Sequence, residues 1–204
     1  MNNFRGLKID KNIMTVEEFY EELSHVNASR ESRLKYANKV LDDRSLFPSL
    51  LDILFMADDK VSCRAAWVFE FVCTQHIYHI IPHLELFTKN LKKIHFDSAV
   101  RPVAKVCQLI ANTYCGKKPN PIKKLLTHQQ QQRIVEAAFD WMISDQKVAA
   151  KVYTMETLYL FGTCNYWIHE ELAQIIEQDF YNQSAGYKAR AKHILKRIKA
   201  KNKK

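Results

Sequence analysis

Two glutamates within apolar stretches are the first residues whose setting suggests chemistry. Glu70 lies in the segment 67–71 and Glu156 in the segment 155–159, both otherwise largely apolar. A carboxylate buried in such surroundings must find a positive partner or take up a proton, and catalytic acids use settings of this kind. Neither glutamate has an obvious nucleophile as a companion in the sequence. We therefore expect each to pair with a base from a neighbouring helix, with catalysis as the alternative.

A second candidate is a cluster of side chains that commonly ligate transition metals, Cys73, His76, His79 and His83. Coordination requires these side chains to converge on one ion. Pro82 breaks the helical register between His79 and His83, so we expect no metal site here. The chain has five cysteines and no Cys-x-x-Cys pair, which is typical of small buried thiols in a reducing compartment.

A repeated pattern indicates which elements hold these residues. An apolar or small residue precedes a base, and a small or apolar residue follows three positions later and, after the last three bases, also six positions later; the bases are Arg64, Arg101, Lys151 and Lys188. Their spacings are 37, 50 and 37 residues, close to the period of helix-turn-helix repeats. Six positions before each base stands a polar residue able to form a turn: Asp58, His95, Asp145 and Asn182.

Over about residues 46–198 the sequence resembles the HEAT-repeat family, in which an aspartate in the turn precedes an arginine or lysine by six positions. The pattern is carried by Asp58 with Arg64 and by Asp145 with Lys151. This resemblance implies an all-α fold, a right-handed α-α superhelix (solenoid) of about ten helices stacked as antiparallel pairs, like HEAT and armadillo proteins. Its period implies architecture rather than a particular activity.

The expected organisation is one domain. Thr15 followed by Glu18 has the spacing of a capping box and predicts the start of the first helix. The segments are 1–45 as N-terminal capping helices, 46–184 as repeats with an enlarged loop at 116–132, and 185–204 as a basic C-terminal helix with a frayed tail. Beyond residue 48 the apolar spacing predicts helices near 48–57, 61–75, 82–94, 98–114, 128–143, 146–161, 166–181 and 185–199.

In a HEAT-like stack the second helix of each pair lines a concave surface. Aligning these helices on their bases predicts one stripe of binding residues there: Arg64, Phe71, Arg101, Lys105, Gln108, Lys151, Met155, Lys188 and Lys192. Such a stripe suits an extended or phosphate-bearing partner. The alternative is that the bases bond the turn residues of neighbouring repeats.

The net charge of +9 is concentrated at one end of the sequence. Residues 185–204 contain nine bases and no acid, and the rest of the chain has 22 bases and 22 acids. A nucleic acid is therefore a candidate partner either for the concave stripe or for this basic tail.

Some residue types are also similar to those of the HEAT-like bacterial alkylpurine DNA glycosylases. Trp67, Trp141, Asp145 and Tyr153, together with the basic stripe, are residues that such a site uses to stack a base and hold the phosphate backbone. The Asn-x-Trp-Asp-type stretch of that family is absent, since Trp141 follows Asp140 here. The resemblance therefore implies nucleic-acid binding rather than glycosylase activity.

The sequence favours a non-enzymatic helical-repeat scaffold that binds a protein or peptide partner on its concave face. The alternative is a nucleic-acid-binding HEAT-like protein related to DNA alkylation repair glycosylases. We expect no catalytic residue, metal or cofactor. The apolar stretches are too short to cross a bilayer, and the first thirty residues hold four glutamates where an export signal needs an apolar run. We therefore expect no transmembrane segment and a cytoplasmic location.

Overall fold

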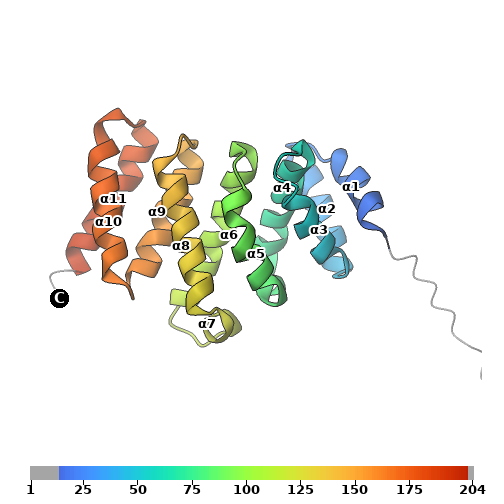
Figure 1. The fold of residues 1–204 in the computed structure, drawn as a ribbon, viewed down its shortest axis with the longest axis horizontal. Helices are drawn as coiled ribbons and strands as arrows, with labels where there is room; N and C mark the ends of the chain where they lie inside the picture. The colour runs from blue at the N-terminus through green and yellow to red at the C-terminus, as the bar shows by residue number, and fades with distance from the viewer. Residues whose placement is uncertain (1–13, 202–204) are drawn as a thin grey trace, which may run out of the picture.

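The computed structural model describes residues 14–201, and this part of the chain is all-helical, with no strand (Figure 1). The α-helices are α1 (Val16–Ser24), α2 (Arg30–Asp42), α3 (Leu46–Leu54), α4 (Lys60–Gln75), α5 (Leu84–Asn90), α6 (Asp97–Cys115), α7 (Pro121–Leu125), α8 (His128–Ile143), α9 (Val148–Gly162), α10 (Tyr166–Asp179) and α11 (Ala185–Lys201). Three short 3₁₀ helices are η1 (Ile77–His83), η2 (Leu91–Lys93) and η3 (Phe180–Asn182). None of the helices within this range is both long and apolar enough to cross a membrane.

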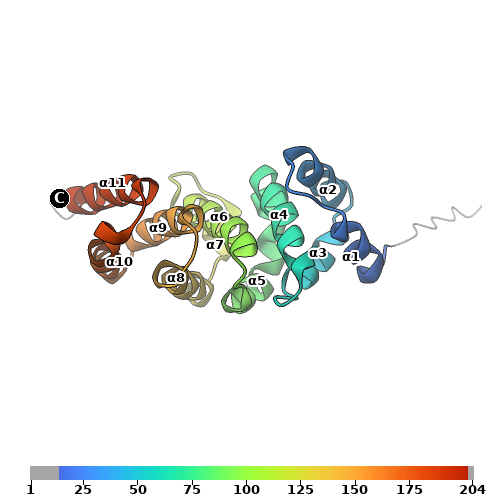
Figure 2. The ribbon, with the colours of Figure 1, turned by 90° about the horizontal axis from the view of Figure 1, so that it is seen from above.

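The helices form two layers side by side (Figure 2). The first layer contains α1, α3, α5, α8 and α10, and the second contains α2, α4, α6, α9 and α11. Each second-layer helix packs against the next one, and the contact between α6 and α9 is the most extensive in the molecule. The pairs α1–α2 and α10–α11 lie at opposite ends of the stack (Figure 1).

Local capping explains where several helices begin. Thr15 Oγ1 accepts from the backbone N–H of Glu18 at 3.2 Å, and the Glu18 carboxylate accepts from the Thr15 N–H at 2.9 Å, so the predicted capping box is confirmed. Helix α8 begins at His128, as the sequence predicts, and carries a second capping box made by Thr127 and Gln130.

One predicted helix differs from the structure. The helix expected near 82–94 is divided into η1, α5 and η2, because Pro82 lacks an N–H and lies within the 3₁₀ turn that precedes α5. Asp58 is exposed in the turn before α4, and the N-cap is the next residue, Asp59, whose carboxylate accepts from the Val61 N–H at 2.7 Å.

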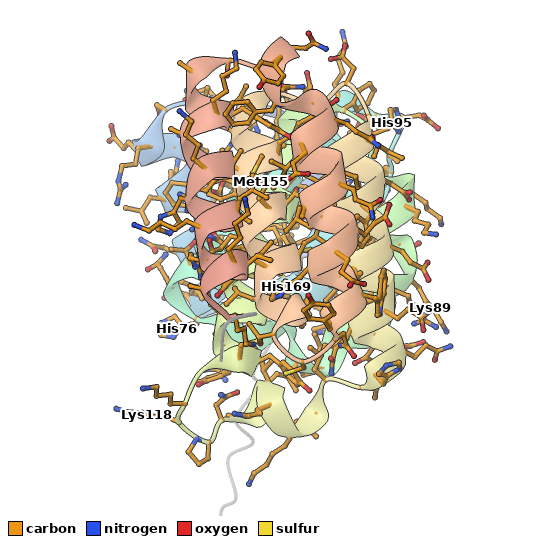
Figure 3. All side chains as sticks on the ribbon, turned by 90° about the vertical axis from the view of Figure 1, so that its left-hand side faces the viewer. His76, Lys89, His95, Lys118, Met155 and His169 are labelled. Atoms are coloured by element: carbon orange, nitrogen blue, oxygen red, sulfur yellow. The ribbon has the colours of Figure 1, made fainter. Side chains whose placement is uncertain are left out.

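The segment 116–132 is more ordered than a simple enlarged loop. It contains α7, which Asn120 caps by accepting from the Lys123 N–H at 2.9 Å, and it includes the start of α8. Ile122 of α7 is fully buried, and α7 packs against η1 and α6. The extra residues of this repeat therefore form a packed element. Figure 3 looks along the stack from its C-terminal end and shows Lys118 extending outward from the loop that precedes α7.

The end of α9 packs tightly against α10. The imidazole of His169 is almost completely buried, stacks on the Tyr159 ring, and has Nε2 2.8 Å from the Tyr159 carbonyl oxygen. Burial lowers the pKa of His169, so the neutral ring donates from Nε2 to that carbonyl. Gly162 lies under the ring, and a Cβ added there would be 2.1 Å from His169 Cδ2. Only glycine leaves room for this histidine.

Replacing Gly162 with alanine is expected to destabilise the protein by about 1–3 kcal/mol, because the imidazole is held by packing and a hydrogen bond and cannot move aside without loss. Urea unfolding followed by circular dichroism measures the effect. Gly186→Ala is the matched control, since a Cβ there meets only Val148 Cγ1 at an ordinary 3.7 Å. Equal stability of the two variants would contradict the packing argument.

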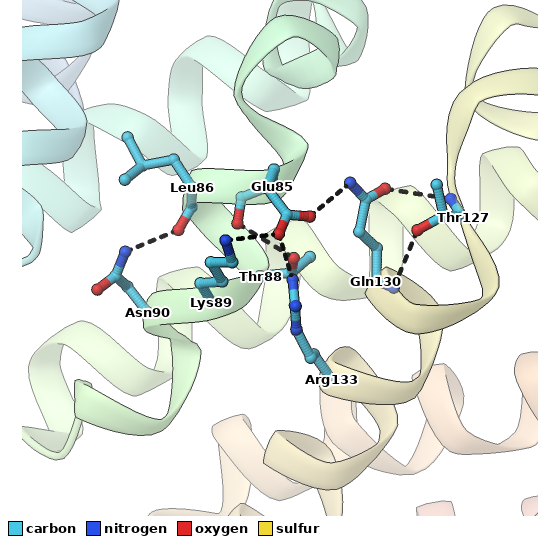
Figure 4. Close-up of polar contacts among 8 residues, drawn as sticks. All are labelled: Glu85, Leu86, Thr88, Lys89, Asn90, Thr127, Gln130 and Arg133. Carbon is cyan, nitrogen blue, oxygen red and sulfur yellow. Dashed lines mark hydrogen bonds and ion pairs between the residues drawn. The ribbon is translucent and has the colours of Figure 1, made fainter.

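Within the first layer, Glu85 connects α5 to α8 (Figure 4). Its carboxylate accepts from Arg133 at 2.9 Å and Gln130 at 3.1 Å, and it forms an ion pair with Lys89 at 2.9 Å. These contacts, led by that from Arg133, lower the pKa of Glu85 from 4.5 to about 2. The two helices are thus linked by a carboxylate that favours its charged form.

The stability that Glu85 contributes is expected to depend on pH in a defined window. Because its folded pKa of about 2 lies below the unfolded value of 4.5, the contribution is complete above about pH 4.5 and disappears as the pH falls toward 2. Glu85→Gln should therefore show a smaller loss of unfolding free energy than wild type between pH 5 and pH 3. Glu170→Gln, on the exposed face of α10, should follow the wild-type curve.

Candidate site: the second-layer surface

The predicted stripe residues all lie on second-layer helices. Arg64, Arg101, Lys151 and Lys188 are each the fourth or fifth residue of α4, α6, α9 and α11. The remaining stripe residues are Phe71 on α4, Lys105 and Gln108 on α6, Met155 on α9 and Lys192 on α11. The sequence pattern therefore selects helices of a single layer, although their side chains are in different environments.

Two of the predicted binding residues lie in the interior. Met155 is fully buried, and Figure 3 shows it among the helices. Lys151 is only 6% exposed, with its Nζ 3.9 Å from a carboxylate oxygen of Asp179. Helix α9 packs against α6, α8, α10 and α11, so most of its side chains are covered by neighbouring helices. Neither residue is accessible to a partner in this structure.

Between α2 and α4, arginines cover an aromatic ring. The guanidinium carbons of Arg33 and Arg30 lie 5.1 and 5.8 Å from the centre of the Phe71 ring, within the range of cation–π attraction. Arg64, further toward the start of α4, contributes to a lowered pKa of Asp59, for which the hydrogen bond from Tyr20 is the main cause. This part of the surface is basic and partly covered by its own cations.

Between α4 and α6, the contact is a bidentate ion pair. Arg101 donates to both carboxylate oxygens of Glu70, at 3.2 and 2.7 Å. Beside it, Trp67 Nε1 donates to the Ser98 carbonyl at 2.9 Å. The prediction that Glu70 pairs with a base from a neighbouring helix is confirmed. Its partner lies on the next helix of the same layer rather than in a turn.

Between α6 and α9, the contact is again a cation against an aromatic ring. Lys105 Nζ lies 4.9 Å from the centre of the Tyr153 ring and donates to Gln108 Oε1 at 2.9 Å. Lys105 and Gln108 were both predicted as binding residues, and both are half-buried at this contact. The ammonium group of Lys105 and the amide oxygen of Gln108 therefore already have partners within the molecule.

Between α9 and α11, both kinds of contact meet at one arginine. Arg197 donates to the two carboxylate oxygens of Glu156 at 2.8 and 2.7 Å, and its guanidinium carbon lies 3.7 Å from the centre of the Tyr159 ring. Arg190 forms a further ion pair with Glu156 at 3.5 Å. Glu156 is 8% exposed, so the two arginines supply the positive charge that a buried carboxylate needs.

We call the solvent-facing side of these helices the second-layer surface, defined by Arg30, Arg33, Arg64, Phe71, Arg101, Lys105, Tyr153, Tyr159, Arg190 and Arg197. Sequence analysis found some of these residues and missed Arg30, Arg33, Tyr159, Arg190 and Arg197. Arg190 and Arg197 were counted only among the nine bases of residues 185–204, and no spacing rule pointed to their contact with α9. The surface consists of cations that alternate with aromatic rings and two paired carboxylates.

The two layers carry opposite charge. The five first-layer helices contain twelve acidic and two basic residues, a net charge of −10. The five second-layer helices contain sixteen basic and five acidic residues, a net charge of +11. The ten helices together have a net charge of only +1, which hides a strong separation of charge across the stack; α11 alone supplies +7 of the second-layer charge.

Other groups with catalytic potential are unfavourably placed. The thiols of Cys73 and Cys107 are buried, and burial raises the pKa of both, which keeps them from forming a reactive thiolate. A pocket of about 260 Å³ between α8 and α10 includes Glu136, whose carboxylate pairs with Lys92 at 2.9 Å. Over residues 14–201, no group of three or more His, Cys, Asp and Glu residues could hold a metal ion.

Comparison with known proteins gives no relative. No family model matches the chain, and no curated protein or solved structure is similar to it.

Replacing Glu156 with glutamine is expected to loosen α11. The amide keeps the shape of the side chain and removes the charge that holds Arg190 and Arg197, so we expect a loss of about 1.5–3 kcal/mol. Amide hydrogen exchange should accelerate mainly in residues 185–201. Glu177→Gln on the exposed side of α10 should leave exchange unchanged. Unchanged protection of α11 in the Glu156 variant would show that the ion pair does not hold this helix.

Proposed function

We propose that this chain is a non-enzymatic helical-repeat scaffold that binds an acidic segment of a partner protein on the second-layer surface. The separation of charge between the layers carries the proposal: the second layer has a net charge of +11 and the first layer −10. Complementary charge speeds association and excludes partners of the wrong sign. The two-layer stack also supports the assignment of a HEAT-like right-handed superhelix, in which the second-layer surface is the concave one.

The state of the two glutamates supports binding rather than catalysis. Glu70 and Glu156 each accept two hydrogen bonds from an arginine of the next helix. Both oxygens of each carboxylate therefore already accept from an arginine of the same molecule. Their role is to hold helices together, which is the expected outcome for acids on apolar helices.

An acidic protein segment fits this surface better than nucleic acid does. The rings of Phe71, Tyr153 and Tyr159 are covered by the cations of the same molecule, so they are not free to stack on bases. The carboxylates of Glu70 and Glu156 interrupt the row of bases. A peptide with spaced carboxylates and amide groups tolerates such a mixed surface, whereas a phosphate backbone favours continuous positive charge.

One observation favours nucleic acid as a second candidate, and it concerns α11 alone. Helix α11 has seven basic residues and no acid between positions 185 and 201. A nucleic acid bound there would be held mainly through its phosphates, with little sequence preference and with strong salt dependence.

Fluorescence anisotropy with two labelled probes, an oligoglutamate peptide and an oligothymidylate of about twenty units each, tests the proposal. Replacing Arg30, Arg64 and Lys105 with glutamine should weaken binding of the peptide by about tenfold or more, since three unsatisfied or lightly used cations are lost. The control variant replaces Lys93, Lys117 and Lys118 with glutamine; these lysines are exposed and lie outside the second layer. It lowers the net charge by the same three units as the first variant and should leave peptide binding nearly unchanged.

The outcomes separate the two candidates. Truncation after Ile198 removes four lysines of the C-terminal segment and should reduce oligothymidylate binding while peptide binding persists. Equal loss of peptide binding in both triple variants would show that net charge, and not this surface, is responsible. Tight oligothymidylate binding that is lost in the second-layer variant would make nucleic acid the partner of this surface.

A further inference from the structure

The N-terminal end of the stack has an acidic, amphipathic face. On α1, Val16 and Tyr20 line a depression of about 450 Å³ together with Met56 from the turn before α4. Glu17 and Glu21, one helical turn apart, lie at its rim and are exposed. Met56 is 41% exposed, so apolar surface is open to solvent between the carboxylates.

The C-terminal end of the stack has a basic face of the same kind. Leu195 and Ala200 of α11 line a depression of about 510 Å³, and the side chains around it are Lys192, Lys196 and Lys199. These lysines follow each other at spacings of four and three residues, so they lie on one side of the helix. The opposite side of α11 is buried against α9 and α10.

Two acids of the N-terminal face and two lysines of the C-terminal face lack partners within the described part of the chain, whereas Lys192 Nζ lies 5.8 Å from the centre of the Phe180 ring. Among residues 14–201, no hydrogen bond or ion pair is made by the side chains of Glu17, Glu21, Lys196 or Lys199. Neighbouring charges on the same helices are used: Glu22 pairs with Lys39, and Arg197 pairs with Glu156. Each end therefore presents a group of unpaired charges beside exposed apolar surface.

The two faces are complementary in sign and in spacing. Glu17 and Glu21 lie about 6 Å apart along α1, and Lys196 and Lys199 lie about 4.5 Å apart along α11. Two helices packed side by side at about 8–10 Å place such rows within reach of each other and bury the apolar residues between them. Leu195 would then contact Tyr20 and Met56.

We propose that copies of this chain associate end to end, with α11 of one copy packed against α1 of the next. The two faces lie at opposite ends of the molecule (Figure 1), so the contact is heterologous and repeats from copy to copy. Such a contact produces open rows of molecules or, where the rotation closes, a ring. It uses lysines that lie outside the second-layer surface, and it does not depend on which partner that surface binds.

Assembly of this kind gives the second-layer surface a further property. Each added copy brings another basic surface, so one long acidic partner can contact several copies at once. Linked sites of this kind bind with an avidity above that of one site. The individual end-to-end contact is small, and interfaces below about 1,200 Å² are typically weak.

Sedimentation velocity of the full chain over about 10–500 µM tests the proposal, since a weak contact is populated only at high concentration. The wild-type sedimentation coefficient should rise with concentration at low salt, and the rise should diminish at high salt. Glu17→Lys with Glu21→Lys, or Lys196→Glu with Lys199→Glu, should each weaken self-association by at least about a hundredfold, because like charges then face each other.

Mixing the two variants is the decisive step. The reversed N-terminal face of one then matches the reversed C-terminal face of the other, so the mixture should associate although neither variant does alone. A single chain that carries all four substitutions should also associate. Circular dichroism verifies that each variant is folded. A wild type that sediments as a monomer at all concentrations, or a mixture that fails to associate, would overturn the proposal.

Discussion

Consecutive second-layer helices must be held together along an edge that faces solvent, and the rest of the structure depends on this contact. In the interior, apolar side chains provide it, most extensively between α6 and α9. At the edge, cations bridge each pair of helices by meeting an aromatic ring or a carboxylate. The bidentate pair of Arg101 with Glu70 also fixes the register, because a fork-shaped guanidinium accepts few orientations. One nitrogen of Arg197 donates to both carboxylate oxygens of Glu156.

The same contacts limit what the surface can bind. A guanidinium that is engaged with a carboxylate of its own chain contributes less to a partner than a free one does, and an aromatic ring under a cation offers no face for stacking. The surface is therefore less basic in effect than its count of bases suggests. In the proposed function, the cations with spare hydrogen-bonding capacity, such as Arg30 and Arg64, contact the partner, while the paired ones maintain the stack.

Local patterns predicted local features well. The capping box of Thr15 and Glu18 and the start of α8 depend only on neighbours in sequence. The pairing of Glu70 with a base followed from the cost of burying a charge. The burial of Met155 was not predicted, because α9 is covered by four other helices and its apolar residues show no single face. The partner of Glu156 could not be predicted either, since Arg197 is 41 residues away in sequence and lies on α11, which packs against α9.

The separation of charge follows from the order of helices rather than from composition. Helices alternate between the layers, so the acidic bias of α1 and α10 and the basic bias of α2 and α11 fall on opposite sides of the stack, while the ten helices together have a net charge of only +1. Charged residues on the helices in the middle of the first layer can pair with bases on neighbouring helices, as Glu85 of α5 does with Arg133 of α8. Within residues 14–201, the helices at the two ends of the stack have a neighbouring pair on one side only. Because the described stack starts in the acidic layer with α1 and finishes in the basic layer with α11, the charges left without partners at its two ends have opposite sign.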